Sequence, residues 1–449
     1  MPKLWQKDYD LDAEVEAFTV GEDHLLDAVL VEADCLGSVA HALTLVRAGV
    51  LKRAEAVKLR RELARVVRDW RAGRFAIARA DEDVHTAVEN RVTKRLGDLG
   101  KKMHTGRSRN DQVIVDLRLW GKAALLDLTA AACEAAGELL KLAAKGKDWP
   151  LVGRTHTQRA MPSSMGLWAG AFAESLLDDV ELLRSAYDLI DRCPLGSAAS
   201  YGVPLPLDRA YTARLLGFRE AHNNVLYANN ARGKFEAICL AAAAQVMLDL
   251  SRLAQDLILW SLPEFGYFRL PRELCSGSSI MPQKRNPCGL ELVRAKAASV
   301  YSQLFAALEI SRALPSGYNR DNQETKGFFM RGLGTATASA RIAALSVRRL
   351  EVDLKALKAA FHPEVFATDE ALDLVLKGVP FRDAYKQVGL NLGKLAGRDP
   401  VAAIRKKKSV GATGNLNLGY AAKKLAAAGK LIAAGRGQAE AVRARLLGR

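Results

Sequence analysis

The sequence contains few cysteines, few aromatic residues and no long apolar run. Its six cysteines form no CxxC pair and have no histidine at zinc-finger spacing, which indicates a reducing cytoplasm and argues against a structural metal. Aromatic residues make up only 6%, so the composition does not suggest surfaces that stack on bases. No apolar run reaches the length of about 18 residues that suggests a membrane span, and the charged start MPKLWQKDYDLD lacks the apolar stretch of a signal peptide. We therefore expect neither a membrane span nor a signal peptide.

Internal repeats, low-complexity tracts and GxGxxG or Walker motifs are also missing, and strand patterns are few and short. Helical spacing of apolar residues dominates instead, as at Leu250, Leu253, Ala254, Leu257 and Ile258. Helices longer than the globular average suggest a bundle, and hence an all-α protein. We predict five long helices, at residues 112–145, 164–192, 235–262, 290–314 and 332–361.

These patterns divide the chain into three predicted domains. Residues 1–104 contain shorter helices joined by polar loops, and residues 105–361 hold the long helices. From residue 362 to 449 the helices shorten again and the composition becomes basic. We expect an N-terminal helical domain, a central long-helix domain and a small C-terminal helical domain.

The net charge of +16 is concentrated near the end of the chain, as in IRKKKS (404–409). A basic balance can indicate nucleic acid, a membrane surface or anionic substrates. No aromatic residues interleave with the basic ones, and no helix-turn-helix or RRM signature occurs. This pattern favours a solvated face, and we do not expect nucleic acid as a partner.

Three polar segments interrupt the helices: HTGRSRNDQ (104–112), GRTHTQRAMP (153–162) and SGSSIMPQKRNP (276–287). In the first, Asn110 or Asp111 could simply cap the following helix. Alternatively, its arginines could grip carboxylates bidentately, helped by the amides of the helix N-terminus.

The second and third segments also have two interpretations each. His156 lies between two threonines, where an imidazole can pass a proton to a leaving group, although a single histidine is more often structural. The third segment could be a solvated connector, or an anion-binding flap whose Gly and Ser residues permit closure. Glu291, in the helix that follows, could pair with a histidine brought from elsewhere.

A family resemblance favours the functional interpretation of all three segments. GSSIMPQKRNP resembles the signature loop of the fumarase/aspartase superfamily, and HTGRSRNDQV together with MPQK resembles the argininosuccinate lyase family within it. DEDVHTAVENR (81–91), PLGSAASYGVPLPLDR (194–209), LPSGYNRDNQETK (314–326) and KGVPFRDAY (377–385) match further family segments, in the family's order, over nearly the whole chain.

The resemblance implies an all-α, three-domain fold whose central domain carries five long helices. In this family those helices form a twenty-helix core in a homotetramer, and each active site takes its motifs from three subunits. The implied reaction is reversible anti β-elimination of argininosuccinate to arginine and fumarate, in the cytoplasm, with no metal and no other cofactor.

The resemblance also assigns roles to residues, by their positions in this sequence. Ser278 would take the Cβ proton, which requires its deprotonated form, and His156, paired with Glu291, would protonate the departing guanidinium nitrogen. The opposite assignment of acid and base stays open. Lys284 and Asn286 would stabilise the dianionic aci-carboxylate intermediate. The implied substrate contacts are Ser108, Arg109, Asn110, Thr155, Tyr318, Gln323 and Lys326, with His85 and Thr86 also near the site.

The sequence departs from the family at several places. NNARGKFE (229–236) stands where most members have an SDRDF-like stretch, and Tyr385 stands where a histidine is common. Many members also have an early substrate-contacting serine, whereas FTVGEDHLLD (18–27) offers no match. Contacts to the arginine end of the substrate are therefore open, while the elimination residues are intact. Another fumarate-releasing lyase, such as an adenylosuccinate lyase, a lens-type structural relative and a nucleic-acid binder are the alternatives.

Overall fold

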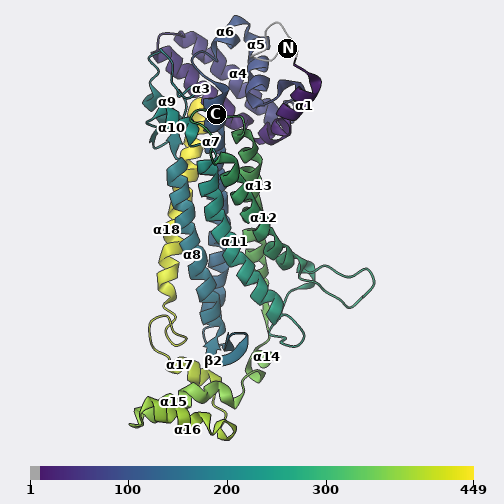
Figure 1. Ribbon diagram of the computed structural model, residues 1–449, viewed down its shortest axis with the longest axis vertical. Helices are drawn as coiled ribbons and strands as arrows, with labels where there is room; N and C mark the ends of the chain where they lie inside the picture. The colour runs from purple at the N-terminus through teal and green to yellow at the C-terminus, as the bar shows by residue number, and fades with distance from the viewer. Residues whose placement is uncertain (1–10, 449) are drawn as a thin grey trace.

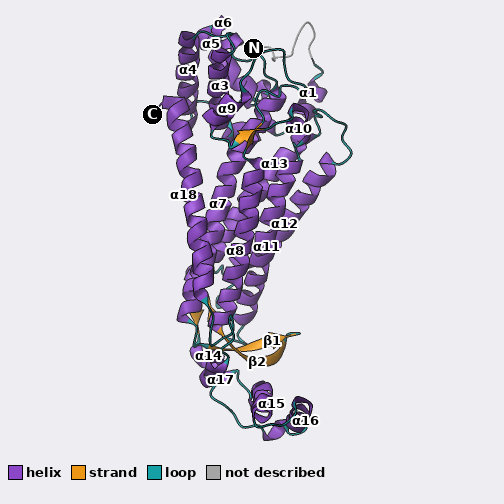
Figure 2. Cartoon of the chain, turned by 90° about the vertical axis from the view of Figure 1, so that its left-hand side faces the viewer, coloured by secondary structure: helices purple, strands orange, loops and turns teal. Residues whose placement is uncertain are grey.

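The computed structural model describes residues 11–448 and consists mainly of helices. The predicted lack of a signal peptide concerns residues 1–10, which lie outside the described part. Figures 1 and 2 show an elongated molecule in which long helices run between two groups of shorter ones. The bundle helices are α7 (Arg109–Lys145), α8 (Met165–Ile190), α11 (Lys234–Trp260), α12 (Cys288–Ser311) and α13 (Asn322–Arg348). The predicted all-α fold is thus confirmed, and each of the five predicted long helices corresponds to one of these helices.

Short helices gather at both ends of the bundle (Figure 1). At one end lie α1 (Ala13–Val20), α2 (Asp23–Leu26), α3 (Val31–Arg47), α4 (Arg53–Arg71), α5 (Val84–Leu96), α6 (Asp98–Lys102), α9 (Arg209–Leu216) and α10 (Val225–Asn230). At the other end lie α14 (Leu354–Ala359), α15 (Ala367–Leu376), α16 (Phe381–Gly389) and α17 (Pro400–Lys406).

The described strands form three two-stranded pairs. The longest pair is the antiparallel hairpin of β1 (Pro150–Thr155) and β2 (Gln158–Ser164), which projects from the bundle near α14 and α17 (Figure 2). The short pairs are β3 (Arg192–Cys193) with β4 (Glu220–Ala221), in parallel, and β5 (Phe268–Arg269) with β6 (Glu351–Val352), antiparallel.

Helix α11 packs against α8, α12 and α13 within the bundle. Leu250, Leu253, Ala254 and Leu257 are buried, as their spacing predicts. With a mean hydropathy of 1.5 over its most apolar window, α11 is long and apolar enough to cross a membrane. Contact with the other helices buries 61% of that window and explains much of its apolar composition.

The prediction for the fifth long helix was wrong in its bounds. Helix α13 begins at Asn322 rather than at residue 332, and it ends at Arg348, before β6. Gly332 lies inside the helix, where a Cβ atom would come 2.2 Å from Leu240 Cδ2. The glycine therefore permits close approach of α13 to α11 and does not mark a helix start.

The expectation that helices shorten after residue 362 was also wrong, because α18 (Leu418–Arg443) has 26 residues. It runs back along the bundle against α7 and α8 (Figure 1). Gly435 allows this contact, since a Cβ atom there would lie 2.9 Å from Leu126 Cδ1. The domain boundaries at residues 104/105 and 361/362 stay a prediction.

His222 joins the loop after β4 to the bundle, and it gives a pH dependence of stability. Arg118 of α7 donates from Nη2 to His222 Nδ1 over 3.2 Å, which requires a ring unprotonated at that nitrogen. Burial, followed by Arg118 and Arg192, lowers the pKa of His222 to about 3. The unfolded chain therefore binds more protons than the folded chain below about pH 6.5, so folding stability falls as the pH drops from there toward 3.

We expect His222→Gln to flatten this dependence, because glutamine does not titrate. Between pH 6.5 and pH 4 the free energy of unfolding of the wild type should fall more steeply than that of the variant, by at most about 1.4 kcal/mol per pH unit. Denaturant unfolding followed by circular dichroism measures both slopes. His362→Gln, at an exposed position, is the matched control. Equal slopes in the wild type and His222→Gln would contradict the assignment.

Candidate active site

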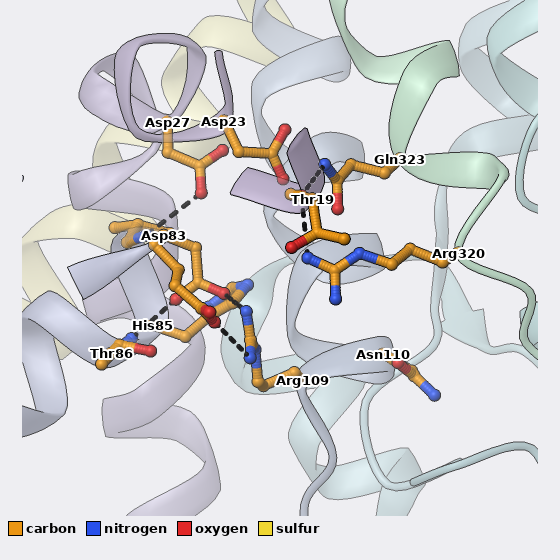
Figure 3. A network of polar contacts seen from close by, with 12 residues as sticks. Thr19, Asp23, Asp27, Asp83, His85, Thr86, Arg109, Asn110, Arg320 and Gln323 are labelled. Carbon is orange, nitrogen blue, oxygen red and sulfur yellow. Dashed lines mark hydrogen bonds and ion pairs between the residues drawn. The ribbon is translucent and has the colours of Figure 1, made fainter. Parts of the chain in front are cut away.

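A charged cavity of about 160 Å³ lies where α2, α5, α7 and α13 meet. Figure 3 shows the side chains of this region, which come from segments far apart in the sequence. Six of the residues predicted to contact substrate line it: His85, Arg109, Asn110, Tyr318, Gln323 and Lys326. The other lining residues are Asp23, Asp27, Asp83, Val113, Arg232 and Arg320.

Helix starts position these side chains. Asp83 caps α5 by accepting a hydrogen bond from the Thr86 amide over 2.9 Å, which places His85 in the first turn. Ser108 is the cap of α7, since its Oγ accepts from the Asn110 amide over 3.2 Å. The predicted Asp111 takes part by completing a capping box, in which its Oδ1 accepts from the Ser108 amide over 3.0 Å. Gln323 and Lys326 lie in the first turns of α13. The cavity therefore collects residues from three helix N-termini, where backbone dipoles favour anions.

Lys326 is fully buried between two carboxylates. Its Nζ lies 2.5 Å from Asp27 Oδ1 and 2.9 Å from Asp23 Oδ1. Burial alone would lower the pKa of Lys326, but Asp27 and Asp23 outweigh burial and raise it. The ammonium is thus a fixed positive charge at neutral pH.

Arg109 is held in the same way by Glu82 and Asp83. Its Nη1 lies 3.1 Å from Glu82 Oε2, and its Nη2 donates to Asp83 Oδ2 (Figure 3). Burial lowers the pKa of Arg109, but Asp83 and Glu82 together outweigh burial, so the pKa lies above its usual value. Arg232, in the divergent NNARGKFE segment, lies over the Tyr318 ring with its Cζ 5.8 Å from the ring centroid. Arg320 donates to the Thr19 carbonyl over 2.8 Å.

His85 belongs to a buried group behind the cavity. Its Nδ1 lies 2.7 Å from Asp34 Oδ2 and 3.6 Å from Asp116 Oδ2, and its Nε2 has no hydrogen-bond partner among the described residues. Burial lowers the pKa of His85, but the bond to Asp34 and the charges of Asp83, Asp34 and Asp27 together outweigh burial and raise it. Burial, with Asp34 next in effect, raises the pKa of Asp116 well above its usual range.

Asp34, His85 and Asp116 could hold a metal ion by geometry, since one ligand atom from each lies within 4.8 Å of the others. The pKa directions instead favour a proton on Asp116 and on His85, which balances the buried charge without an ion. Arg107, also buried, adds positive charge nearby. That the protein uses no metal stays a prediction.

The predicted acid, His156, lies elsewhere, at the tip of the β1–β2 hairpin. His156 and Thr157 form its two-residue turn with φ of 50° and 64°, as in a type I′ turn. Positive φ is costly for a β-branched residue such as Thr157, and such strain is concentrated at functional sites. The sequence did not predict a hairpin here. Thr155, His156 and Thr157 are all exposed.

The predicted base, Ser278, lies in a third place, on a flap of residues 276–286. The flap extends from the side of the bundle between α11 and α12 (Figure 1), and a β-bridge between Ser276 and Asn286 closes its base. Ser278 Oγ accepts hydrogen bonds from the amides of Ile280 and Met281 over 3.3 and 3.1 Å. Lys284 is exposed, and Glu291 lies in the first turn of α12.

One chain therefore brings together only some of the predicted site residues. Among the described residues, no hydrogen bond or ion pair joins His156 to Glu291 or to the flap. Thr86 and Ser108 act as helix-capping partners beside the cavity. Sequence reasoning missed Asp23, Asp27, Asp83, Arg232 and Arg320. Three of these, Asp23, Asp27 and Arg232, lie in the segments that depart from the family pattern, and that departure was the available signal.

A second cavity, of about 390 Å³, lies between α18 and helices α3, α4 and α7. It is larger, and Trp70, Trp120 and Tyr187 form part of its wall. No residue predicted to act on substrate lines it. Charge and chemistry, rather than size, therefore identify the smaller cavity as the candidate active site.

Comparison with known proteins defines the class of this one. Residues 9–302 match the family model described as Lyase. A crystal structure of EDDS lyase in complex with formate shares the fold with a TM-score of 0.81 and 22% identity, over 98% of this chain and 95% of that one. A class II fumarase from Schistosoma mansoni shares the fold with a TM-score of 0.69 and 18% identity, over 86% of this chain and 94% of that one. The protein is thus a lyase of all-α architecture.

Sequence relatives identify the family within that class. The argininosuccinate lyase of Sorangium cellulosum (strain So ce56) is 46% identical over 423 residues, which cover 94% of this chain and 98% of that protein. The argininosuccinate lyase of Thermotoga neapolitana is 42% identical over 392 residues, which cover 87% of this chain and 98% of that protein. The chain therefore belongs to the argininosuccinate lyase family, as its motifs predict.

Proposed function

We propose that this protein is an argininosuccinate lyase, which splits argininosuccinate reversibly into L-arginine and fumarate in the last step of arginine biosynthesis. One observation carries the proposal: His85, Arg109, Asn110, Tyr318, Gln323 and Lys326 line one cavity, in a chain 46% identical to a protein of that name. The cavity combines fixed cations with helix N-termini, as a substrate with several carboxylates requires. We place the enzyme in the cytoplasm, without a cofactor.

In the proposed reaction Ser278 removes the Cβ proton of the succinyl group. The electron pair of that C–H bond forms the double bond of fumarate, the C–N bond breaks, and His156 protonates the departing guanidinium nitrogen. A serine hydroxyl is a poor base unless its deprotonated form is stabilised. The two amides that donate to Ser278 Oγ, with Lys284 nearby in the flap, supply that stabilisation.

Lys284 and Asn286 would stabilise the aci-carboxylate on which negative charge accumulates during proton removal. Closure of the flap over the substrate would exclude water and strengthen these contacts. Glu291 would pair with His156 and raise its basicity. The reverse assignment of acid and base to Ser278 and His156 uses the same groups, and it predicts the same residues to be essential.

We further propose a homotetramer in which different subunits complete each site. The hairpin, the flap and the residues that line the cavity lie apart in one chain, which supports a site completed by other subunits. The outer faces of the bundle helices also expose large apolar side chains, which a twenty-helix core would bury. They include Leu248 of α11, Leu292, Phe305 and Leu308 of α12, and Ile342 of α13.

The first test is release of fumarate, followed by ultraviolet absorbance, with argininosuccinate and adenylosuccinate offered separately. We expect release from argininosuccinate alone, because the MPQK and SRND motifs match the argininosuccinate lyases. Release from adenylosuccinate would identify a different lyase of the same superfamily. Release from neither substrate, by protein with a cooperative thermal unfolding transition, would contradict the proposed function and favour a structural role.

A further inference from the structure

Three carboxylates face the candidate active-site cavity, although its proposed substrate is rich in carboxylates itself. Like charges repel, so these side chains must be neutralised or must bind a cationic part of the substrate. Both carboxylate oxygens of Asp27 have partners, because Oδ1 contacts Lys326 and Oδ2 accepts from the Val84 amide over 3.1 Å. Both oxygens of Asp83 also have partners, since Oδ1 accepts from the Thr86 amide and Oδ2 from Arg109.

Asp23 differs from these two carboxylates. Its Oδ1 contacts Lys326, but among the described residues no hydrogen bond or ion pair is recorded for its Oδ2. The Asp23 side chain is 17% exposed, against 1% for Asp27 and 8% for Asp83. Figure 3 shows Asp23 beside Thr19 and Gln323, at the edge of the cavity. Asp23 therefore offers a carboxylate oxygen to a ligand.

The charges around Asp23 favour a cation at this oxygen. Burial raises the pKa of Asp23, Lys326 lowers it, and Asp27 raises it again. Lys326 serves two carboxylates at once, so one positive charge is shared between two negative ones. Arg232 also lowers the pKa of Asp23, but no ion pair joins the two among the described residues, so a ligand cation at Asp23 Oδ2 would add to the balance.

We propose that Asp23 binds the α-ammonium group of the arginine end of the substrate, and so selects an α-amino acid at that end. The inference rests on the proposed function. It also answers the question left by the FTVGEDHLLD segment, which has no serine matching the family. The substrate carries two cationic groups, of which the guanidinium must lie at the acid and base, because the breaking C–N bond joins it to the succinyl carbon. The α-ammonium, several bonds away, is the group left for Asp23.

The reverse reaction tests this proposal, with fumarate consumption followed by absorbance. Arginine and 5-guanidinopentanoate, which is arginine without its α-amino group, are offered as alternative partners of fumarate. We expect the wild type to prefer arginine in kcat/KM, and Asp23→Asn to reduce that preference by about 10- to 100-fold, the usual worth of one charged hydrogen bond. The loss should fall on arginine alone and mainly on its KM.

Glu22→Gln is the matched control, since Glu22 is the adjacent acid, 71% exposed, and does not line the cavity. Asp23→Ser is a second variant in case Asp23→Asn does not fold, and it should lose the same preference. An unchanged preference in folded Asp23 variants would overturn this inference alone. Equal weakening of both partners would also overturn it, since Asp23 would then act on a group that both partners share, the guanidinium or the carboxylate. A wild type that consumes fumarate with neither partner would overturn the proposed function, and this inference with it.

Discussion

Replacement of Ser278 with alanine is expected to reduce kcat for argininosuccinate cleavage by about 10²–10⁴-fold, the usual range for loss of a general base. Folding should be unaffected, because within residues 11–448 the hydroxyl bonds only to the Ile280 and Met281 amides of its own flap. Those amides already point at the oxygen that must carry negative charge before it takes the proton. Alanine keeps the flap backbone but removes that oxygen.

Single-turnover and steady-state fumarate release, with thermal unfolding as the check on folding, measure this effect. Ser279→Ala is the matched control, because Ser279 is the exposed neighbour with no side-chain hydrogen bond recorded among the described residues. We expect the control to keep most of its activity. If Ser278→Ala kept more than about a tenth of wild-type kcat, its loss of transition-state stabilisation would be too small for a catalytic base.

The sequence predicted the helical architecture well because burial follows the period of the helix. Positions such as Leu250 and Leu257 repeat on one face of α11, and both are buried. It failed at Gly332 and along α18, where glycines lie inside helices. Those glycines serve close packing between helices, at Leu240 and at Leu126, and a packing distance is not visible in the sequence of one helix.

For the site, motifs predicted which residue types matter but not how they meet. Gln323 and Lys326 share a cavity with His85 and Arg109 because three helix starts converge on it. Nothing in the spacing of these residues along the chain specifies that convergence. The carboxylates that balance the cations, such as Asp27 with Lys326, escaped notice because sequence reasoning looked for groups that bind anions. A buried cation needs a partner, and this rule could have prompted a search for them.

The separation of the hairpin from the flap leads to the other large predicted effect. A mixture of His156→Asn and Ser278→Ala subunits should regain activity that neither variant has alone. In a tetramer whose sites take the hairpin from one subunit and the flap from another, random mixing gives about a quarter of the sites both native residues. The recovered activity should therefore approach about a quarter of the wild-type value after equal mixing and subunit exchange. Native mass spectrometry of differently tagged subunits shows that mixed tetramers have formed.

His156→Asn mixed with His156→Gln is the control, because no arrangement of those subunits restores a native hairpin. It should stay inactive however well the subunits exchange. If His156→Asn and Ser278→Ala also stayed inactive in tetramers shown to be mixed, the hairpin and the flap would have to come from the same subunit. That outcome would require a movement of the flap toward the hairpin within one chain, because no contact between them is recorded among residues 11–448. Recovery, in contrast, would explain why the chain exposes both catalytic segments: each would be completed by a neighbouring subunit.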